Sequence, residues 1–135
     1  MTSCGVWLSK RRLLAVGVDD DGRASPAIFA GTHDDARWGL LESVEAVHGL
    51  DCELVFPENL LRVDSIAHLA LKRGASISVA PQRLVDAIRI VAGLATGPPA
   101  RVAAMLARLS IVPALRLHLH RLDPHSCDRR QLPLL

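Results

Sequence analysis

The chain has 135 residues, half of them hydrophobic, and its 16 Lys and Arg against 14 Asp and Glu give a formal net charge of +2. This length suits a single domain, and this apolar content argues against a disordered main body. The nearly balanced charge permits nucleic-acid binding without requiring it, while the absence of Tyr and the presence of only two Phe and two Trp disfavour a protein that binds mainly by base stacking.

The cysteines and the lengths of the hydrophobic runs indicate the cellular compartment of the protein. Cys4, Cys52 and Cys127 are far apart in sequence and form no CxxC pair, which argues against a structural zinc site or a disulfide framework. Charges interrupt every hydrophobic run well before the ~18 residues that a membrane span needs, and the N-terminus lacks the apolar stretch of a signal peptide. We therefore expect free thiols, a cytoplasmic location and no membrane contact.

The first third of the chain predicts three short strands. Residues 6–8 and 13–18 are apolar runs separated by a polar turn, and residues 19–22 (Asp-Asp-Asp-Gly) have the chemistry of a second turn. The acidic run could also bind a cation, but a plain turn is the better interpretation because its side chains lie in a few exposed residues. A third strand is expected near residues 27–30, after Pro26.

The first helix is expected to begin at Thr32, whose hydroxyl can cap free backbone N–H groups. Asp34 and Asp35 place negative charge at the positive end of its dipole, and Gly49 is suited to end it. Trp38 lies off the apolar stripe and is either an interface residue or a half-exposed surface residue. The stripe itself has helical spacing and consists of Leu40, Leu41, Val44 and Val47.

Two strand–helix units follow. Residues 53–56 predict a strand before a helix that stops at Gly74, and residues 76–79 predict a strand before a helix with Pro81 in its first turn. Strands that alternate with helices of this length indicate parallel pairing with right-handed crossovers. The apolar faces of the two helices consist of Val63, Ile66, Ala67 and Ala70, and of Leu84, Val85, Ile88 and Val91.

The C-terminal part begins at the break formed by residues 97–99 (Gly-Pro-Pro). A short helix carrying Val102, Leu106 and Leu109 on one face is expected next. Residues 115–122 alternate as in a strand but could also extend a helix, and the rest has the composition of a tail. The sequence thus predicts an α/β domain over residues 1–112, with an extension or tail over 113–135. Its order, βββαβαβα, predicts a five-stranded mixed sheet with helices on both faces.

Three short segments carry a family resemblance. Residues 5–10 read Gly-Val-Trp-Leu-Ser-Lys, residues 53–59 read Glu-Leu-Val-Phe-Pro-Glu-Asn, and residues 72–83 read Lys-Arg-Gly-Ala-Ser-Ile-Ser-Val-Ala-Pro-Gln-Arg. Together with the order of elements, they resemble the RNase H-like superfamily, and within it the RuvC-like N-terminal domain of DEDD (Piv-type) transposases. That family has Gly-Ile-Asp-Val-Ser-Lys, a fourth strand ending in a catalytic glutamate, and Arg-Gly…Val-Val-Asn-Pro-Arg-Gln at these places.

The resemblance implies a nuclease in which carboxylates hold two Mg²⁺ ions, yet most of these carboxylates are missing. Trp7 stands at the first acid position, where it could stack on a base or, as its apolar neighbours favour, fill the former metal pocket. The family's Thr-Asp-x-x-Asp-Ala motif falls on residues 96–101, which contain no aspartate. Glu58 is the sole candidate remnant, but a solvated carboxylate at a strand–helix junction is the better interpretation of it. We expect a catalytically degenerate domain without cofactor, linked to a mobile element.

The expected role of such a domain is binding, to DNA or RNA or to a protein. Phosphate contacts are predicted for a set of basic residues that would lie near one another on the same sheet, namely Lys10, Arg11, Arg12, Lys72, Arg73 and Arg83. For Lys10, Arg11 and Arg12, a solvated basic turn is an equally good interpretation.

Two other hypotheses remain open. A Mg²⁺-dependent nuclease with a rearranged acidic site would use Glu58 with Asp19 or Asp64, whose carboxyl groups would have to converge. A structural module would dimerise through an exposed apolar face, for which Ile90 and Leu71 are candidates because they lie off the main helix stripes.

The tail holds side chains that can bind transition metals. His118 and His120 would share one face of a strand, and Asp123, His125 and Cys127 follow. Because no second cluster with zinc-finger spacing accompanies them, we expect no metal site.

Overall fold

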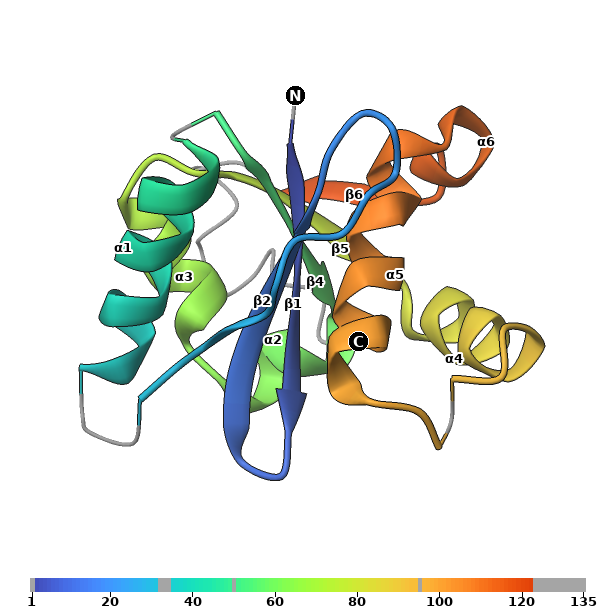
Figure 1. Cartoon of the computed structure of the whole chain (residues 1–135), viewed down its shortest axis with the longest axis horizontal. Helices are drawn as coiled ribbons and strands as arrows, with labels where there is room; N and C mark the ends of the chain where they lie inside the picture. The colour runs from blue at the N-terminus through green and yellow to red at the C-terminus, as the bar shows by residue number, and fades with distance from the viewer. Residues whose placement is uncertain (1, 32–34, 50, 95, 123–135) are drawn as a thin grey trace.

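A single mixed β-sheet organises the chain in the computed structural model, which describes residues 2–31, 35–49, 51–94 and 96–122 (Figure 1). Within these residues the sheet has six strands in the order β3-β2-β1-β4-β5-β6. Strand β1 pairs antiparallel with β2 and parallel with β4, β5 is parallel to β4, and the two outer strands β3 and β6 are antiparallel to their neighbours. The strands are β1 (Ser3–Ser9), β2 (Arg12–Val18), β3 (Ile28–Phe29), β4 (Glu53–Pro57), β5 (Ser76–Ala80) and β6 (His120–Leu122).

The α/β class and the mixed sheet are confirmed, but the expected number of five strands is wrong. The sixth strand, β6, lies in the segment 115–122, for which a strand and a helix were both open. Both occur there, because Pro113 opens a one-turn helix, α6 (Pro113–Arg116), before the chain reaches β5. Only three residues of β6 then pair with β5, which is too short a run to give a pattern of its own.

Helices cover both faces of the sheet, as expected (Figure 1). On one face lie α1 (Ala36–His48), α2 (Glu58–Val63) and α3 (Ile66–Lys72), and on the other α4 (Gln82–Val91) and α5 (Pro99–Ile111). The α2–α3 segment was predicted as one helix. It divides because Asp64 has extended backbone angles and its carboxylate accepts a hydrogen bond from the Ile66 N–H at 2.9 Å.

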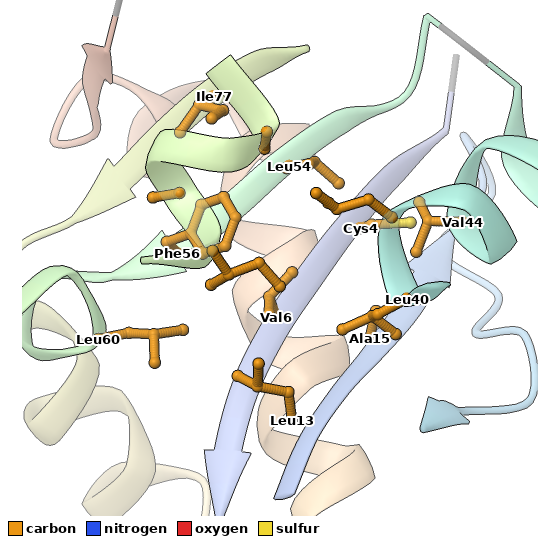
Figure 2. Close-up of a cluster of buried hydrophobic side chains, with 14 of the residues drawn as sticks. Cys4, Val6, Leu13, Ala15, Leu40, Val44, Leu54, Phe56, Leu60 and Ile77 are labelled. Carbon is orange, nitrogen blue, oxygen red and sulfur yellow. The ribbon is translucent and has the colours of Figure 1, made fainter. Parts of the chain in front are cut away.

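The main hydrophobic core fills the space between the sheet and the helices α1 and α3 (Figure 2). Alternate residues of β1, Cys4 and Val6, point into it and meet Phe56 of β4, which is fully buried. Three valines of the predicted apolar stripes are instead exposed, namely Val47 (63%), Val63 (68%) and Val91 (88%). Each lies in the last turn of its helix, so helical spacing alone does not show how far along a helix its contact with the sheet extends.

The observed ends of α1 agree in part with those predicted from the sequence. The helix begins at Ala36 with Asp35 as its N-cap residue, while Thr32 and Asp34 lie outside the described residues. Gly49 ends it as predicted, with φ of 89° and its N–H bonded to the Glu45 carbonyl at 2.9 Å.

The other face of β1 lies directly against α5. Gly5 faces this helix, and a Cβ atom at Gly5 would stand 1.8 Å from the Ala103 carbonyl oxygen. Small residues at both positions therefore allow the helix and strand backbones to approach closely.

Candidate functional site

The edge of the sheet at which the parallel strands end is the first place to look for a site. Strand β1 ends at Ser9, β4 at Pro57 and β5 at Ala80, and we call this edge the carboxyl edge. The opposite edge, at which these strands begin, is the amino edge. In open α/β sheets, ligands bind outside the carboxyl ends of the strands.

Two neighbouring hollows lie at the carboxyl edge. The first, which we call the Trp7 cavity, has a volume of about 380 Å³ and is walled by β1, the β4–α2 junction and α4. The second, the basic hollow, has a volume of about 530 Å³ and lies between the β1–β2 hairpin and the start of α1. Leu8 lines both of them, so the two hollows adjoin across one side chain.

Trp7, at the first acid position of the resemblance, both packs and lines a cavity. Its ring contacts the apolar clusters beneath α5 and is partly buried. The Arg89 guanidinium of α4 lies over the ring, 5.1 Å from its centroid. The Arg89 Nε atom is buried, and within the part of the chain that the structure describes it has no hydrogen-bond acceptor. A buried donor without a partner is costly, so an acceptor that reached this nitrogen would stabilise the cavity wall.

Glu58 joins the starts of two helices. It follows β4 directly, and its carboxylate accepts a hydrogen bond from the Gln82 backbone N–H at 3.1 Å. The Gln82 side-chain oxygen in turn accepts from the Asn59 N–H at 3.3 Å. Because the Glu58 carboxylate lies at the positive end of the α4 dipole, the geometry gives it a capping role.

Removal of this cap has a measurable cost. We expect Glu58→Ala to lower the free energy of unfolding by about 1 kcal/mol, the usual value of a lost N-terminal cap. Glu58→Gln keeps an acceptor oxygen and should lose less than half of that. Urea denaturation of both variants measures the difference, and equal stability of Glu58→Ala and the wild type would contradict the capping role.

The other two acids of the rearranged-site hypothesis are placed differently. Asp19 follows β2, whose last residue Val18 pairs with Ser3, so Asp19 lies at the amino edge, away from Glu58. Its carboxylate closes the turn by accepting from the N–H groups of Asp21 and Arg23, each at 3.0 Å, as the turn interpretation predicted. The structure thus does not bring Asp19 and Glu58 together.

Asp64 lines the basic hollow, but its carboxylate is already paired with an arginine. It is 5% exposed and accepts two hydrogen bonds from Arg37, at 2.7 and 2.8 Å. This pair raises the pKa of Arg37, because the hydrogen bond and charge of Asp64 favour the protonated guanidinium. Among the described residues, no three His, Cys, Asp or Glu side chains form a group able to hold a metal ion.

The tip of the β1–β2 hairpin presents basic side chains in a constrained turn. Lys10 and Arg11 are exposed and have φ values of 49° and 68°. Positive φ at both central residues is the requirement of a type I′ turn, which favours Asn-Gly and is strained for longer side chains. Arg12 is held more firmly, since its Nε donates to the Ala30 carbonyl at 3.2 Å and its guanidinium lies 4.6 Å from the centre of the Phe29 ring.

The remaining predicted basic residues do not join this group. Lys72 ends α3 shortly before β5 begins, so Lys72 and Arg73 lie at the amino edge. Arg73 also pairs with Glu45 at 2.5 Å and lies over the half-exposed Trp38 ring, 4.2 Å from its centroid. Arg83 follows β5 on the carboxyl side, but it lines a separate hollow beside α6. The expected single basic surface is therefore divided into three parts.

Sequence reasoning missed two residues of this edge, Arg37 and Arg89. Arg37 is the second residue of α1 and reaches the basic hollow because β3 leads the chain back beside the hairpin. Arg89 comes about two helical turns after Pro81 and meets Trp7 only through the packing of α4. The helical spacing of the apolar residues does predict that Arg89 lies at the border of the apolar face, since it follows Ile88 directly.

Other candidates from the sequence are only partly placed. His118 lies in the turn between α6 and β6, while His120 is in β6, so they do not share a strand face. Asp123, His125 and Cys127 lie outside the described residues. Of the two proposed surface residues, Ile90 is 74% exposed, whereas Leu71 is only 5% exposed and belongs to the core.

Comparison with known proteins adds no family: no protein-family model and no curated protein matches this chain. None of the helices described is long and apolar enough to cross a membrane. The site itself must therefore carry the functional argument.

Proposed function

We propose that this chain is a RuvC-like domain of the RNase H-like type that has lost its metal site and binds nucleic acid through phosphate contacts at the carboxyl edge. The order of elements supports this fold, because β1 to α4 follow βββαβαβα when α2 and α3 count as one helical segment. The observation that carries the proposal is the position of the basic hairpin, which adjoins the Trp7 cavity across Leu8.

The charge of the basic hollow favours an anionic ligand. Of the described residues that line it, four are cationic and one is a carboxylate, and Arg37 already neutralises that carboxylate. Lys10 and Arg11 are therefore in excess, and the turn holds both at fixed positions. Non-glycine residues with left-handed backbone angles cluster at functional sites, where the surrounding structure holds them in a strained conformation.

The Trp7 cavity supplies a second contact of the same kind. Arg89 offers a buried donor without an acceptor, and Gln82 and Asn59 add amide groups to the same wall. A phosphate or base oxygen in the cavity would satisfy Arg89, while a nucleic-acid strand continued past Leu8 would reach the hairpin. Glu58 is used to cap α4, which supports a binding role in preference to metal-dependent cleavage.

A salt titration tests the binding site. Replacing Lys10 and Arg11 with Asn and Gly removes both charges and gives the turn the pair of residues it prefers. We expect affinity for duplex, branched or single-stranded DNA to fall at least about tenfold, and the slope of log K against log salt to decrease by roughly 0.7–0.9 for each lost contact.

Lys72→Asn is the matched control, because it removes one exposed charge at the amino edge. It should leave affinity and salt slope nearly unchanged. Absence of salt-dependent binding to all three nucleic acids, or an equal loss in Lys72→Asn, would refute the proposed surface. Robust Mg²⁺- or Mn²⁺-dependent cleavage that Glu58→Ala abolishes would refute the loss of the metal site.

A further inference from the structure

Two cysteines that are far apart in sequence meet in the core. Cys4 lies in β1, and Cys52 directly precedes β4. Their Sγ atoms are 3.1 Å apart, and the residues are 0% and 4% exposed. Parallel pairing of β1 with β4 brings this about, because Cys4 is aligned with Leu54, two residues along the strand from Cys52. Both cysteines are free thiols, as expected, but their distance in sequence gave no sign that they are in contact.

The two thiols differ in acidity. The pKa of Cys52 is lowered, chiefly by its side-chain hydrogen bond with Cys4, although burial and Glu53 oppose this effect. The same hydrogen bond, together with burial, raises the pKa of Cys4 well above its ordinary value. Cys52 is thus the better nucleophile, since the thiolate is the reactive form.

Cys52 also has access to solvent through a cavity between α1 and α3. The cavity has a volume of about 270 Å³, and Cys52 lines it while Cys4 does not. Gly49, Asp51 and Gly74 line it too, and all three are exposed, so it reaches the protein surface. A molecule the size of hydrogen peroxide fits such a space, because a water molecule occupies roughly 30 Å³ in the liquid.

We propose that Cys4 and Cys52 form a redox-active dithiol that closes to a disulfide when a hydroperoxide enters this cavity. The Cys52 thiolate attacks one peroxide oxygen, the O–O bond breaks, and hydroxide leaves, so that Cys52 becomes a sulfenic acid. The Cys4 sulfur then attacks the Cys52 sulfur, the S–O bond breaks, and the oxygen leaves as water with the Cys4 proton. In total, two thiols are oxidised by two electrons and one peroxide is reduced to two waters.

The test uses the full chain with Cys127→Ser, which leaves Cys4 and Cys52 as its cysteines. The folded protein is treated with hydrogen peroxide, then denatured and alkylated, and its mass is measured by mass spectrometry. We expect the loss of two hydrogen atoms and of both alkylation sites, with reversal by dithiothreitol. Proteolysis should yield one linked peptide pair that contains Cys4 and Cys52.

Two comparisons make the result decisive. In the same background, Cys4→Ala should stop the reaction at the Cys52 sulfenic acid, which dimedone traps. Protein unfolded in urea should form the disulfide more slowly than folded protein, because only the fold holds the sulfurs together. Retention of both thiols after peroxide treatment, or a disulfide that forms no faster in the folded than in the unfolded protein, would overturn the proposal. Neither outcome depends on nucleic-acid binding.

Discussion

Replacing Gly5 with alanine is expected to lower the free energy of unfolding by about 3 kcal/mol, at the upper end of the usual cost of overpacking. The added Cβ would stand 1.8 Å from the Ala103 carbonyl oxygen and 2.9 Å from the Ala107 backbone nitrogen. Both obstacles are backbone atoms of α5, so no side chain can rotate away to make room. The helix must move off β1, and the apolar contacts beneath it must loosen.

Gly39→Ala is the matched control for this substitution. Gly39 lies within α1, and apart from its chain neighbours and the nearby backbone of its own helix, no atom of the described residues approaches within 4 Å of a Cβ at this position. Because glycine weakens a helix interior, this variant should gain about 0.5–1 kcal/mol. Urea denaturation measures both changes. A loss below about 1 kcal/mol for Gly5→Ala would contradict the close approach of β1 and α5, since overpacking usually costs more.

The role of Gly5 shows where sequence reasoning ends. The apolar runs and their turns predicted β1, β2, β4 and β5, because strand formation there follows from local pattern. The same pattern placed Gly5 at the opening of a strand without a reason for a glycine. That reason lies in Ala103, which is distant in sequence and meets Gly5 only after α5 crosses the sheet. Local periodicity carries no information about such a contact.

The basic residues and the cysteines illustrate a different case, in which the predicted pairing of the strands already indicates which residues lie together. In a parallel sheet, residues that precede the strands lie at the amino edge, and residues that follow the strands lie at the carboxyl edge. Lys72 precedes β5 and Lys10 follows β1, so the predicted parallel pairing already separates them. The same pairing brings the starts of β1 and β4 together, and with them Cys4 and Cys52.

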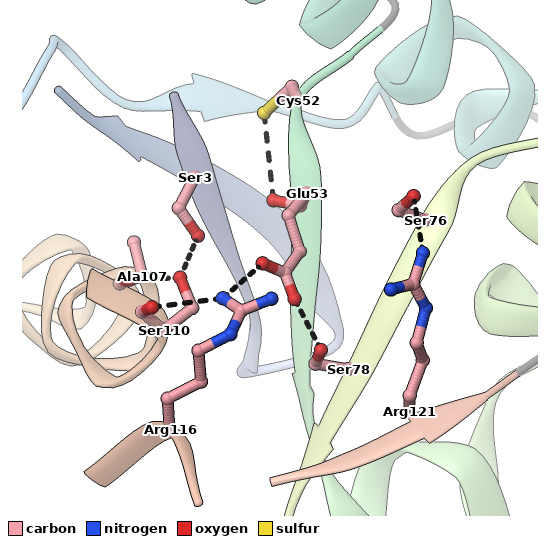
Figure 3. A network of polar contacts seen from close by, with 9 residues as sticks. All are labelled: Ser3, Cys52, Glu53, Ser76, Ser78, Ala107, Ser110, Arg116 and Arg121. Carbon is pink, nitrogen blue, oxygen red and sulfur yellow. Dashed lines mark hydrogen bonds and ion pairs between the residues drawn. The ribbon is translucent and has the colours of Figure 1, made fainter. Parts of the chain in front are cut away.

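A partly buried ion pair at the amino edge attaches the C-terminal segment to the sheet (Figure 3). Arg116 of α6 donates to the Glu53 carboxylate at 2.8 Å and to the Ser110 carbonyl at 2.9 Å. The second carboxylate oxygen of Glu53 accepts from the Ser78 hydroxyl. Glu53 is 7% exposed, and the pair connects α6 to the centre of the sheet.

Arg116→Ala is therefore expected to lower the free energy of unfolding by about 2 kcal/mol. Loss of one partner of a buried pair costs about 3–5 kcal/mol, and we expect less here because water already screens a partly exposed partner. The Arg116 side chain is 47% exposed. Arg121→Ala is the control, since Arg121 is exposed and, among the described residues, its side chain makes one hydrogen bond, of 3.5 Å, to Ser76; it should change stability by less than about 0.5 kcal/mol.

A second substitution separates the charge of Glu53 from the packing of Arg116. In the Arg116→Ala background, Glu53→Gln removes the stranded charge and keeps an oxygen that accepts from Ser78. The double variant should recover about half of the lost stability, because a buried neutral amide costs less than an unpaired carboxylate. If it is no more stable than Arg116→Ala, the cost comes from lost packing of α6. Recovery means that the cost of Arg116→Ala comes from the Glu53 charge left without its partner.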